Sequence, residues 1–476
     1  MLETLAFIAI VTQNQVALRA APYDSAQQQA VLWQGDSLEI RGRRMDYLQV
    51  YDHRRERAGY ILASQVRGYS MKPDGAPELL AVSRFLRETP GSEALGIAVT
   101  AAFLKAAPPE AIGAEAFDQL GTFAERLARR ASSRQASQGK QNDSVLAAHL
   151  EVATSYGVTL TSFEREGRVQ ICYNGDAFRR VMALPANPEQ KARAALALTR
   201  HDCVDPNLPP LERQALDLWR ADVLDRVDLT NLPDNLKNRV HLRRAGVWAA
   251  IAHHKARQGE AAAKGMKEAA NRAIDALAAI NKTELSEEDA VAYNDAAIRV
   301  GASRWAAVGK PFMGSASKLS LETKPGKPGE TCVQLLEEQS GKKVQMLERC
   351  SYGVVWKHSF AVNINGTAAT LAVQPLATWR ELWVFQKKGN EWSLTALPPA
   401  LNNPELGYLE FAGWVPGGKQ LLAAREAKVD GRFRKTFELV KLDTLEIEKK
   451  ADKPDSLSLF YRWQSPEWKR TTLTSR

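Results

Sequence analysis

The stretch GWVPGGKQ, Gly413 to Gln420, decides which fold its part of the chain adopts. It fits the phosphate-loop pattern G-x-x-x-x-G-K, which in a nucleotide site follows a strand, opens a helix and has Ser or Thr after the Lys. Here Gln420 stands at the Ser/Thr position, and residues 421–443 read as two strands around an Asp430-Gly431 turn. We therefore expect Pro416-Gly417-Gly418 to be a tight turn between antiparallel strands, and no nucleotide site.

The same β character extends over residues 331–476. Seven of the eleven tryptophans lie between Trp356 and Trp468. Asn365-Gly366 separates two strand-like runs and is a strong hairpin signal, and Lys388-Gly389-Asn390 separates two more. We predict an antiparallel all-β domain over 331–476.

Two interpretations of the tryptophans in this domain stay open. Trp379, Trp383, Trp392 and Trp414 are expected to fill a core, and the alternative is that some stack on a sugar or a peptide. The stretch with Trp414, Pro416, Gly418 and Lys419 resembles the Trp-x-Pro-x-Gly-Lys turn of β-propeller blades. The region supplies only two or three such units, fewer than the four blades that close a propeller, so we expect a small sandwich or meander.

Residues 78–308 are rich in Ala, Leu and Arg, with apolar residues three and four positions apart, which predicts an all-α domain of helical hairpins. Ser286 before three acidic residues indicates a helix start, and Arg243–Ile280 reads as two helices turning near Gly259. This pair loosely resembles a TPR-like hairpin, without a 34-residue repeat. One hairpin is expected within Val158–Tyr173, and residues 70–77 and 309–330 read as linkers.

Residues 1–69 predict a small all-β domain, because short β-rich runs alternate with turn residues. Four stretches resemble the motifs of a bacterial SH3 (SH3b) domain, in the same order and with similar spacing. These are VALRAAP (16–22), LWQGDSLEI (32–40), DYLQVYD (46–52) and RAGYILASQV (57–66). Arg19, Pro22, Gly35, Asp36 and Gly59 match the family, whereas Tyr47 and Tyr60 stand where it has tryptophan. The resemblance implies an SH3-like barrel.

The same resemblance implies a ligand groove. Domains of this type bind short peptides with aromatic side chains, and the bacterial family implies cell-wall peptides or partner proteins as ligands. In this chain the groove would be lined by Arg19, Trp33, Tyr47, Tyr51 and Tyr60.

The four cysteines form two local pairs, Cys172 with Cys203 and Cys332 with Cys350. Nearest-neighbour pairing into two disulfides is favoured over the other connectivities and indicates an oxidising compartment, whereas four ordinary thiols would fit a cytosolic protein. His201 with Cys172 and Cys203 offers three zinc ligands, and His201 with Cys203 a base and a nucleophile. Neither pattern has usual spacing or further partners, so we expect no metal and no cofactor.

Net charge and hydropathy restrict the remaining classes. The chain has 476 residues and a net charge of +9, spread along its helices rather than gathered in a patch. We therefore expect no nucleic-acid partner. No apolar run is long enough for a transmembrane segment. Leu5 to Val11 is interpreted as a first strand or as the remnant of a signal sequence already removed.

The sequence thus predicts three domains, 1–69, 78–308 and 331–476: a barrel, a helical scaffold and a β-domain. Since no catalytic motif is found, the expected function is a non-catalytic periplasmic binding or scaffold protein. Its partner would be a protein or a cell-wall peptide, and its oligomeric state stays open. One alternative is a cell-wall hydrolase, or its accessory, targeted by the SH3b-like module. Another is a basic cytosolic nucleic-acid-binding protein.

Overall fold

The computed structural model describes residues 7–134, 140–165, 167–308, 318–401 and 406–469. Contacts divide the chain into two compact units. Unit 1 is Met1–Pro209 with Arg226–Leu232, and unit 2 is Pro210–Asp225 with Pro233–Arg476. The described elements follow the expected β, α, β order, and the three domain boundaries stay predictions.

Unit 1 begins with an antiparallel sheet. Its strands are β1 Phe7–Val11, β2 Val16–Arg19, β3 Gln28–Leu32, β4 Ser37–Arg44, β5 Tyr47–Asp52, β6 Arg57–Leu62 and β7 Val66–Ser70. They pair in the order β3-β2-β6-β5-β4-β1-β7. Alternate side chains on one face, such as Leu18, Leu38, Val50 and Ile61, form a buried core. Among the described strands no pairing joins β3 to β7, so closure into a barrel stays a prediction.

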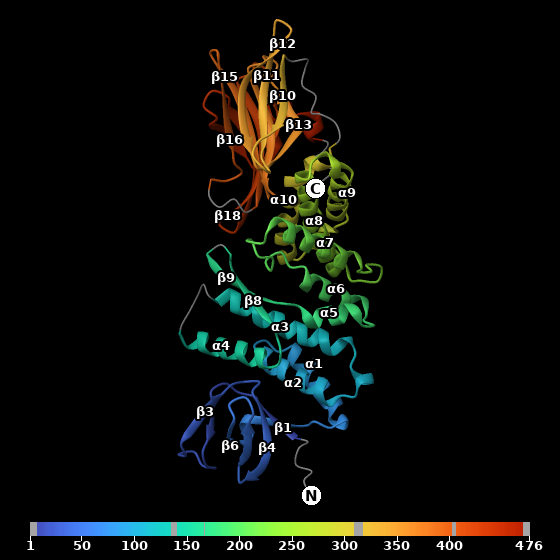
Figure 1. Cartoon of the computed structure of the whole chain (residues 1–476), viewed down its shortest axis with the longest axis vertical. Helices are drawn as coiled ribbons and strands as arrows, with labels where there is room; N and C mark the ends of the chain where they lie inside the picture. The colour runs from blue at the N-terminus through green and yellow to red at the C-terminus, as the bar shows by residue number, and fades with distance from the viewer. Residues whose placement is uncertain (1–6, 135–139, 166, 309–317, 402–405, 470–476) are drawn as a thin grey trace. The chain divides into compact units, whose positions relative to one another are not determined.

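Six helices and a hairpin complete the described part of unit 1 (Figure 1). They are α1 Ala76–Arg87, α2 Glu93–Ala106, α3 Ala114–Arg134, α4 Lys140–Ser155, α5 Asp176–Ala183 and α6 Pro188–Leu198, with β8 Leu160–Arg165 and β9 Arg168–Tyr173. Ile10 of β1 and Tyr69 of β7 belong to the same buried core as Ile97 and Phe123 of the helices. The sheet and the helices of unit 1 therefore share one core.

The helices of unit 2 are α7 Pro210–Asp225, α8 Asp234–Arg257, α9 Ala263–Ala278 and α10 Glu287–Ser303, followed by the short helix η6 Arg304–Ala306. The predicted pair turns at Gly259, whose φ of 78° suits glycine. The Ser286 hydroxyl accepts a hydrogen bond from the Asp289 N–H, which confirms the predicted helix start.

Two sheets form the β-region of unit 2. The smaller pairs β10 Leu319–Pro325, β11 Thr331–Gln339 and β12 Lys342–Ser351. The larger has the order β13-β14-β15-β17-β18-β19-β20, with β16 also paired to β15. Its strands are β13 Val354–Val362, β14 Ala368–Leu376, β15 Trp379–Lys388, β16 Glu391–Leu397, β17 Gly407–Trp414, β18 Gln420–Val429, β19 Arg432–Lys441 and β20 Ile447–Ala451. A last helix, α11 Ser458–Trp463, packs Phe460 against Phe437 of β19.

Three clusters of buried hydrophobic side chains lie between the layers of this β-region. The first lies between the small sheet and strands β13 to β16 and contains Trp383 and Phe385. The second lies between β13–β15 and β17–β19 and contains Leu382 and Val384. The third lies on the other face of β17–β19, against α11. Successive residues of β15 point to opposite faces and belong to different clusters, so this strand is buried on both faces.

The stretch Gly413–Gln420 forms the turn between β17 and the antiparallel strand β18, as predicted. Gly417 and Gly418 have φ values of 96° and 71°. The predicted hairpins at Asn365-Gly366, at Asp430-Gly431 and within 158–173 are confirmed. Trp379, Trp383 and Trp392 are buried, and Trp414 is partly buried against the second cluster, in agreement with their interpretation as core.

The sequence missed two strands. Strand β10 lies within the segment 309–330 that was expected to be a linker, and β7 crosses the expected end of the first β-domain. Residues 309–317 of that linker, and Leu5 and Ala6 of the expected first strand, lie outside the described residues.

Candidate functional site: the outward face of the N-terminal sheet

Four of the five predicted groove residues lie on one face of the N-terminal sheet. Tyr60 of β6 lies opposite Arg19 of β2 on one side and opposite Gln49 of β5 on the other. Tyr47 and Tyr51 lie two positions on either side of Gln49, so they share its face. This is the face opposite the buried Leu18, Val50 and Ile61 row. We call Arg19, Gln49, Tyr51 and Tyr60 the outward face.

Tyr51, which lies next to β4 on this face, is surrounded by charged side chains. The Arg41 guanidinium lies 4.0 Å from the centre of the Tyr51 ring, and the His53 ring lies 4.9 Å from it. Both side chains also pair with Glu39, Arg41 at 3.2 Å and His53 at 2.8 Å. The hydrogen bond from Arg41 lowers the pKa of Glu39, so this carboxylate is ionised at neutral pH. The ring of Tyr51 is thus held in place while remaining partly exposed.

Tyr47 differs from its neighbours because its ring is buried. Its hydroxyl donates a hydrogen bond to the Asp24 carboxylate, which raises the pKa of Tyr47. The Arg19 guanidinium donates to the Ala26 carbonyl at 3.1 Å, in the same connection between β2 and β3. Tyr47 therefore lies on this face but is held by the β2–β3 connection, and Arg19, Tyr51 and Tyr60 are the partly exposed residues of the face.

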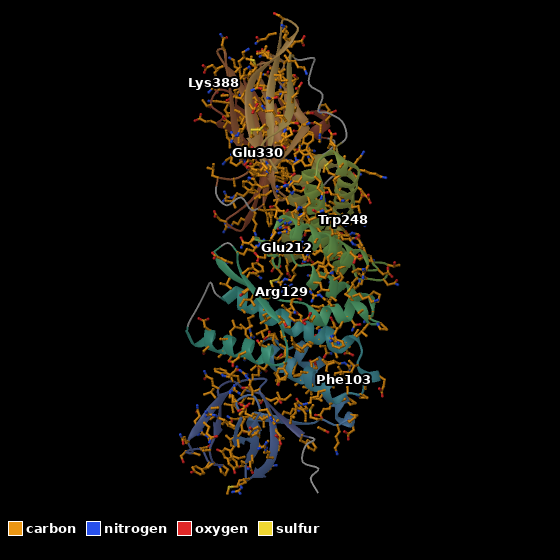
Figure 2. The ribbon with its side chains drawn as sticks, viewed as in Figure 1. Phe103, Arg129, Glu212, Trp248, Glu330 and Lys388 are labelled. Carbon is orange, nitrogen blue, oxygen red and sulfur yellow. A yellow bond between two sulfur atoms is a disulfide. The ribbon has the colours of Figure 1, made fainter. Side chains whose placement is uncertain are left out.

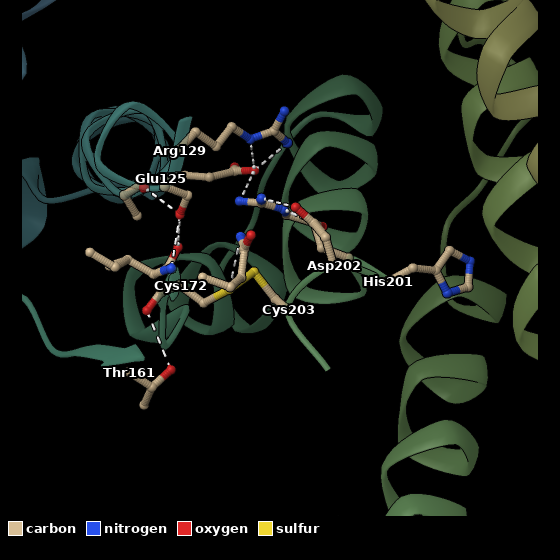
Figure 3. Close-up of a disulfide and its surroundings, with 12 residues drawn as sticks. Glu125, Arg129, Thr161, Cys172, His201, Asp202 and Cys203 are labelled. Carbon is tan, nitrogen blue, oxygen red and sulfur yellow. Dashed lines mark hydrogen bonds and ion pairs between the residues drawn. A yellow bond between two sulfur atoms is a disulfide. The ribbon is translucent and has the colours of Figure 1, made fainter. Parts of the chain in front are cut away.

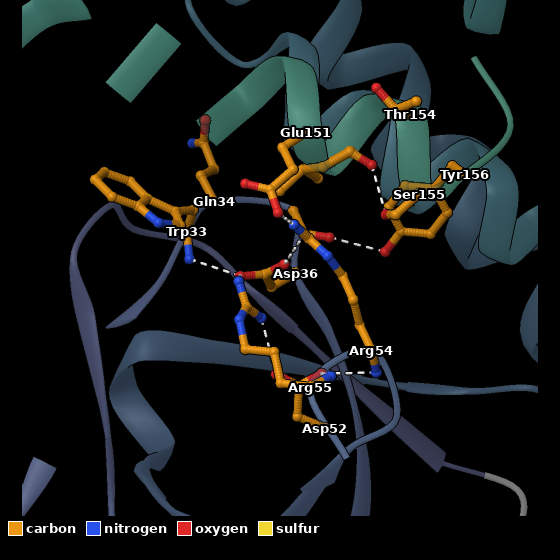
Figure 4. A network of polar contacts seen from close by, with 12 residues as sticks. Trp33, Gln34, Asp36, Asp52, Arg54, Arg55, Glu151, Thr154, Ser155 and Tyr156 are labelled. Carbon is orange, nitrogen blue, oxygen red and sulfur yellow. Dashed lines mark hydrogen bonds and ion pairs between the residues drawn. The ribbon is translucent and has the colours of Figure 1, made fainter. Parts of the chain in front are cut away.

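Trp33 lies apart from the outward face, at the turn between β3 and β4. Its backbone N–H donates to Asp36 at 2.9 Å. Figure 4 shows that Asp36 receives both Arg54 and Arg55, each at 3.1 Å. Arg54 also pairs with Glu151 of α4, so this turn is an anchor between the sheet and the helices.

The anchor continues through Gly35 and His149. The Tyr156 hydroxyl donates to the Gly35 carbonyl at 2.8 Å, and a Cβ on Gly35 would lie 2.7 Å from the Ala94 carbonyl oxygen. His149 of α4 lies 2.9 Å from an Arg130 nitrogen and 2.7 Å from the Asn14 side-chain oxygen. The Gly-Asp motif at Gly35-Asp36 is thus the place where the sheet meets the helices.

The sequence did not point to Arg41, Gln49 or His53 as members of the site. Arg41 lies at a register shift in the β4–β5 pairing, between Ile40 and Gly42, and His53 lies in the turn after β5. Alternation along β5 is the signal that could have identified Gln49, since it lies between two of the predicted tyrosines.

The Cys172–Cys203 disulfide rules out two alternatives considered for these cysteines, a zinc site and a catalytic nucleophile. It joins β9 to the segment after α6, with a Cα–Cα distance of 5.7 Å. Since both sulfurs are bonded to each other, neither is a thiolate ligand or a nucleophile. Figure 3 shows His201 pointing away from the disulfide, while Arg200 pairs with Asp202 and with Glu125.

The second disulfide joins Cys332 to Cys350, directly opposite each other on β11 and β12. Glu330 lies close to both sulfurs. Among the residues that the structure describes, these three form the one set of three or more potential metal ligands that lie within reach of one another. The disulfide removes them as a metal site. All four cysteines are paired as the sequence favoured, which indicates an oxidising compartment outside the cytoplasm.

Buried charges in unit 2 hold its helices to its sheet. Glu410 of β17 pairs with Arg304 of η6 and lies 3.5 Å from Arg380 of β15. Arg380 also donates to the carbonyls of Gly301 and Ala302, at 2.7 and 3.1 Å. Burial lowers the pKa of Arg380 to about 10, which leaves it charged at neutral pH. All these partners come from the chain itself, so the cluster is structural.

The adjacent histidines of α8 do not converge on one point. His253 is buried, with its ring centre 5.9 Å from that of His254. His254 lies 3.2 Å from the Asp217 carboxylate of α7. His254 is thus a contact between α8 and α7, whereas His253 is a buried residue of α8, and adjacent helix positions point in different directions as expected.

No family model, curated protein or solved structure matches this chain. No described helix is both long enough and apolar enough to cross a lipid bilayer. The case for the outward face therefore depends on the residues themselves.

Proposed function

We propose that this chain is a non-catalytic binding protein of the bacterial cell envelope. Its N-terminal sheet acts as an SH3b-like module, closed into a barrel, and recognises a short peptide of the cell wall or of a partner protein. The helices and the C-terminal β-domain serve as the scaffold that holds this module. The two disulfides support a periplasmic location, because that compartment is oxidising.

One observation carries this proposal: Arg19 and Tyr60 lie directly opposite each other on the outward face, with Tyr51 and Arg41 in contact nearby. Aromatic rings offer flat apolar surface for a peptide backbone, and guanidinium groups pair with carboxylates. We therefore expect a peptide that carries free carboxylates, as cell-wall stem peptides do.

The anchor supports the same assignment. The helices contact the sheet at the Gly35-Asp36 turn and along β1 and β7, where Ile10 and Tyr69 are buried in the shared core. The part of the sheet formed by β2, β5 and β6 carries the outward face, which keeps Arg19, Tyr51 and Tyr60 partly exposed. A binding module fixed to a scaffold in this way presents its ligand face without a mobile linker.

Co-sedimentation with purified, insoluble peptidoglycan tests the proposal. The wild-type chain is expected to pellet with the polymer, and Tyr60→Ala with Arg19→Ala to remain in the supernatant. Tyr352→Ala is the matched control, since Tyr352 is 55% exposed and belongs to unit 2 rather than to the module. Equal pelleting of all three proteins would contradict the assignment of the face. Release of soluble fragments from the polymer would contradict the non-catalytic part.

A further inference from the structure

The β-region of unit 2 contains a pocket of about 840 Å³ at one end of its larger sheet. This volume is within the range of about 300–1,000 Å³ that is usual for small-molecule sites. The ends of β15 and β19, the start of β14, the turn between β17 and β18 and one residue of β20 form its wall. Its lining includes Gln386, Lys388, Gly418, Lys419, Lys441 and Leu442.

The pocket lies at the end of the larger sheet opposite to the strand pairing that joins its two arms. Strands β15 and β17 pair in parallel only at Trp379–Gly407 and Arg380–Tyr408. Beyond that point β15 pairs with β16 instead, and β17 continues with β18. The second buried cluster fills the space between these two arms and ends at Ala368 and Leu442, which also line the pocket. The pocket is thus the open end of an apolar layer.

Gln386 is the polar group at the base of this pocket. It follows Leu382 and Val384 on the inward side of β15, so its side chain continues the row that faces the second cluster. It is only 6% exposed, and its amide nitrogen has no hydrogen-bond partner among the described residues. A buried donor without an acceptor is costly, and a bound acceptor would remove that cost.

Three lysines surround the mouth of the pocket: Lys388 at the end of β15, Lys419 before β18 and Lys441 at the end of β19 (Figure 2 labels Lys388). All three are exposed, and none pairs with a carboxylate in the described parts of the chain.

The lining also contains Lys387, Asp443 and Glu448. Lys387 pairs with Glu337 at 3.2 Å, and Glu448 accepts a hydrogen bond from Gln420 at 2.5 Å. Asp443 is the remaining acidic group. Three lysines against the two carboxylates of Asp443 and Glu448 leave the mouth with an excess of one positive charge.

The β17–β18 turn, which contains the phosphate-loop-like stretch, packs against the β13–β14 hairpin. The Gly417 carbonyl accepts a hydrogen bond from the Asn365 amide at 3.5 Å. A Cβ on Gly418 would lie 2.4 Å from that same amide nitrogen. The glycines therefore let the β17–β18 turn pack against the β13–β14 hairpin, which places Lys419 beside the pocket.

We propose that this pocket binds a small ligand with at least two oxyanion groups, phosphate or carboxylate. The lysines pair with the oxyanions, and Gln386 donates its amide N–H to an acceptor at the base. This site is in unit 2 and is independent of the peptide-binding function proposed for unit 1.

Isothermal titration of the full chain with pyrophosphate, with citrate and with neutral maltose tests the proposal. We expect pyrophosphate, citrate or both to bind and maltose not to bind; the anion that binds more tightly identifies phosphate or carboxylate as the natural group. Lys419→Ala with Lys441→Ala is expected to weaken binding by about tenfold or more, since two charge-assisted contacts are lost.

Two variants complete the experiment. Lys342→Ala with Lys357→Ala removes the same number of exposed lysines outside the pocket and is expected to leave affinity within about twofold, as distant surface charges are screened. Gln386→Met keeps the side-chain size and removes the amide donor, and it is expected to weaken binding without lowering the melting temperature of the chain. Absence of binding by both anions, or equal loss in the pocket and control lysine variants, would overturn the proposal.

Discussion

The pH dependence of unit 1 should follow one histidine, His149, in the anchor between sheet and helices. Its ring is 2% exposed, and it lies between the Arg130 guanidinium and the Asn14 side-chain oxygen. Burial first, and then the positive charge of Arg130, lower its pKa from 6.5 to about 4. The ring is therefore neutral in the folded chain, accepting from Arg130 and donating to Asn14.

The sign of the effect follows from proton binding. Between pH 6.5 and pH 4 the unfolded chain binds a proton at this histidine that the folded chain does not bind. Stability is therefore highest above pH 6.5 and falls as the pH is lowered toward 4. Integrated from pH 7 to pH 4.5, the shift corresponds to a loss of about 2 kcal/mol in the free energy of unfolding.

Urea unfolding at pH 7 and pH 4.5 measures this loss. A deuterium pulse followed by mass spectrometry of α4 peptides reports on unit 1 separately from unit 2. In His149→Gln the amide can still accept from Arg130 and donate to Asn14, but it does not titrate, so the pH dependence should shrink by about 2 kcal/mol. Peptides of α8, which belongs to unit 2, are the internal control and should keep their wild-type pH dependence in His149→Gln. An unchanged pH dependence in His149→Gln would refute this reasoning.

Three further predictions concern stability, each measured by urea unfolding. Gly35→Ala should lose about 2–3 kcal/mol, because its φ is 94° and the new Cβ would lie 2.7 Å from a carbonyl oxygen of α2; a loss within error would contradict the anchor. Glu410→Gln should lose about 3–5 kcal/mol, since it leaves the buried Arg380 without its counter-charge; an unchanged midpoint would show that the cluster is not stabilising. Replacing Cys172 and Cys203 by alanine should cost about 3–4 kcal/mol for a sequence separation of 31; equal stability would contradict a structural disulfide.

Local signals in the sequence predicted local structure well. Asn365-Gly366 and Asp430-Gly431 are hairpin turns, because such pairs adopt positive φ readily. Ser286 begins a helix, because its hydroxyl satisfies a free N–H of the first turn. Each of these outcomes depends on a few neighbouring residues.

Features that depend on distant residues were not predictable in the same way. Strand β10 was not expected because the segment around it is rich in Gly, Pro and Lys, and it is a strand because residues 319–325 pair with β11. The contact between Gly35 and Ala94 joins positions far apart in the chain. The division into two units assigns Pro210–Asp225 and Arg226–Leu232 to different units, which no change of composition marks.

The candidate site shows the same division. The family resemblance grouped Arg19, Tyr51 and Tyr60, and the strand pairing places them on one face, because side-chain direction alternates along a strand. It did not predict that Trp33 would lie at the anchor, because the position of α4 decides that. The lysine pocket requires three separate strand ends to meet, so the sequence around Lys419 alone does not indicate it.

The central claim is that the outward face binds a peptide with free carboxylates. The most direct measurement is the affinity of the full chain for a soluble cell-wall stem peptide and for the same peptide with its carboxylates amidated. The account predicts binding of the free peptide and at least about tenfold weaker binding of the amidated one, since charge-assisted pairing with Arg19 is lost. It predicts a similar loss for Tyr60→Ala. Equal affinity for both peptides in wild type and variant, or no binding at all, would contradict it.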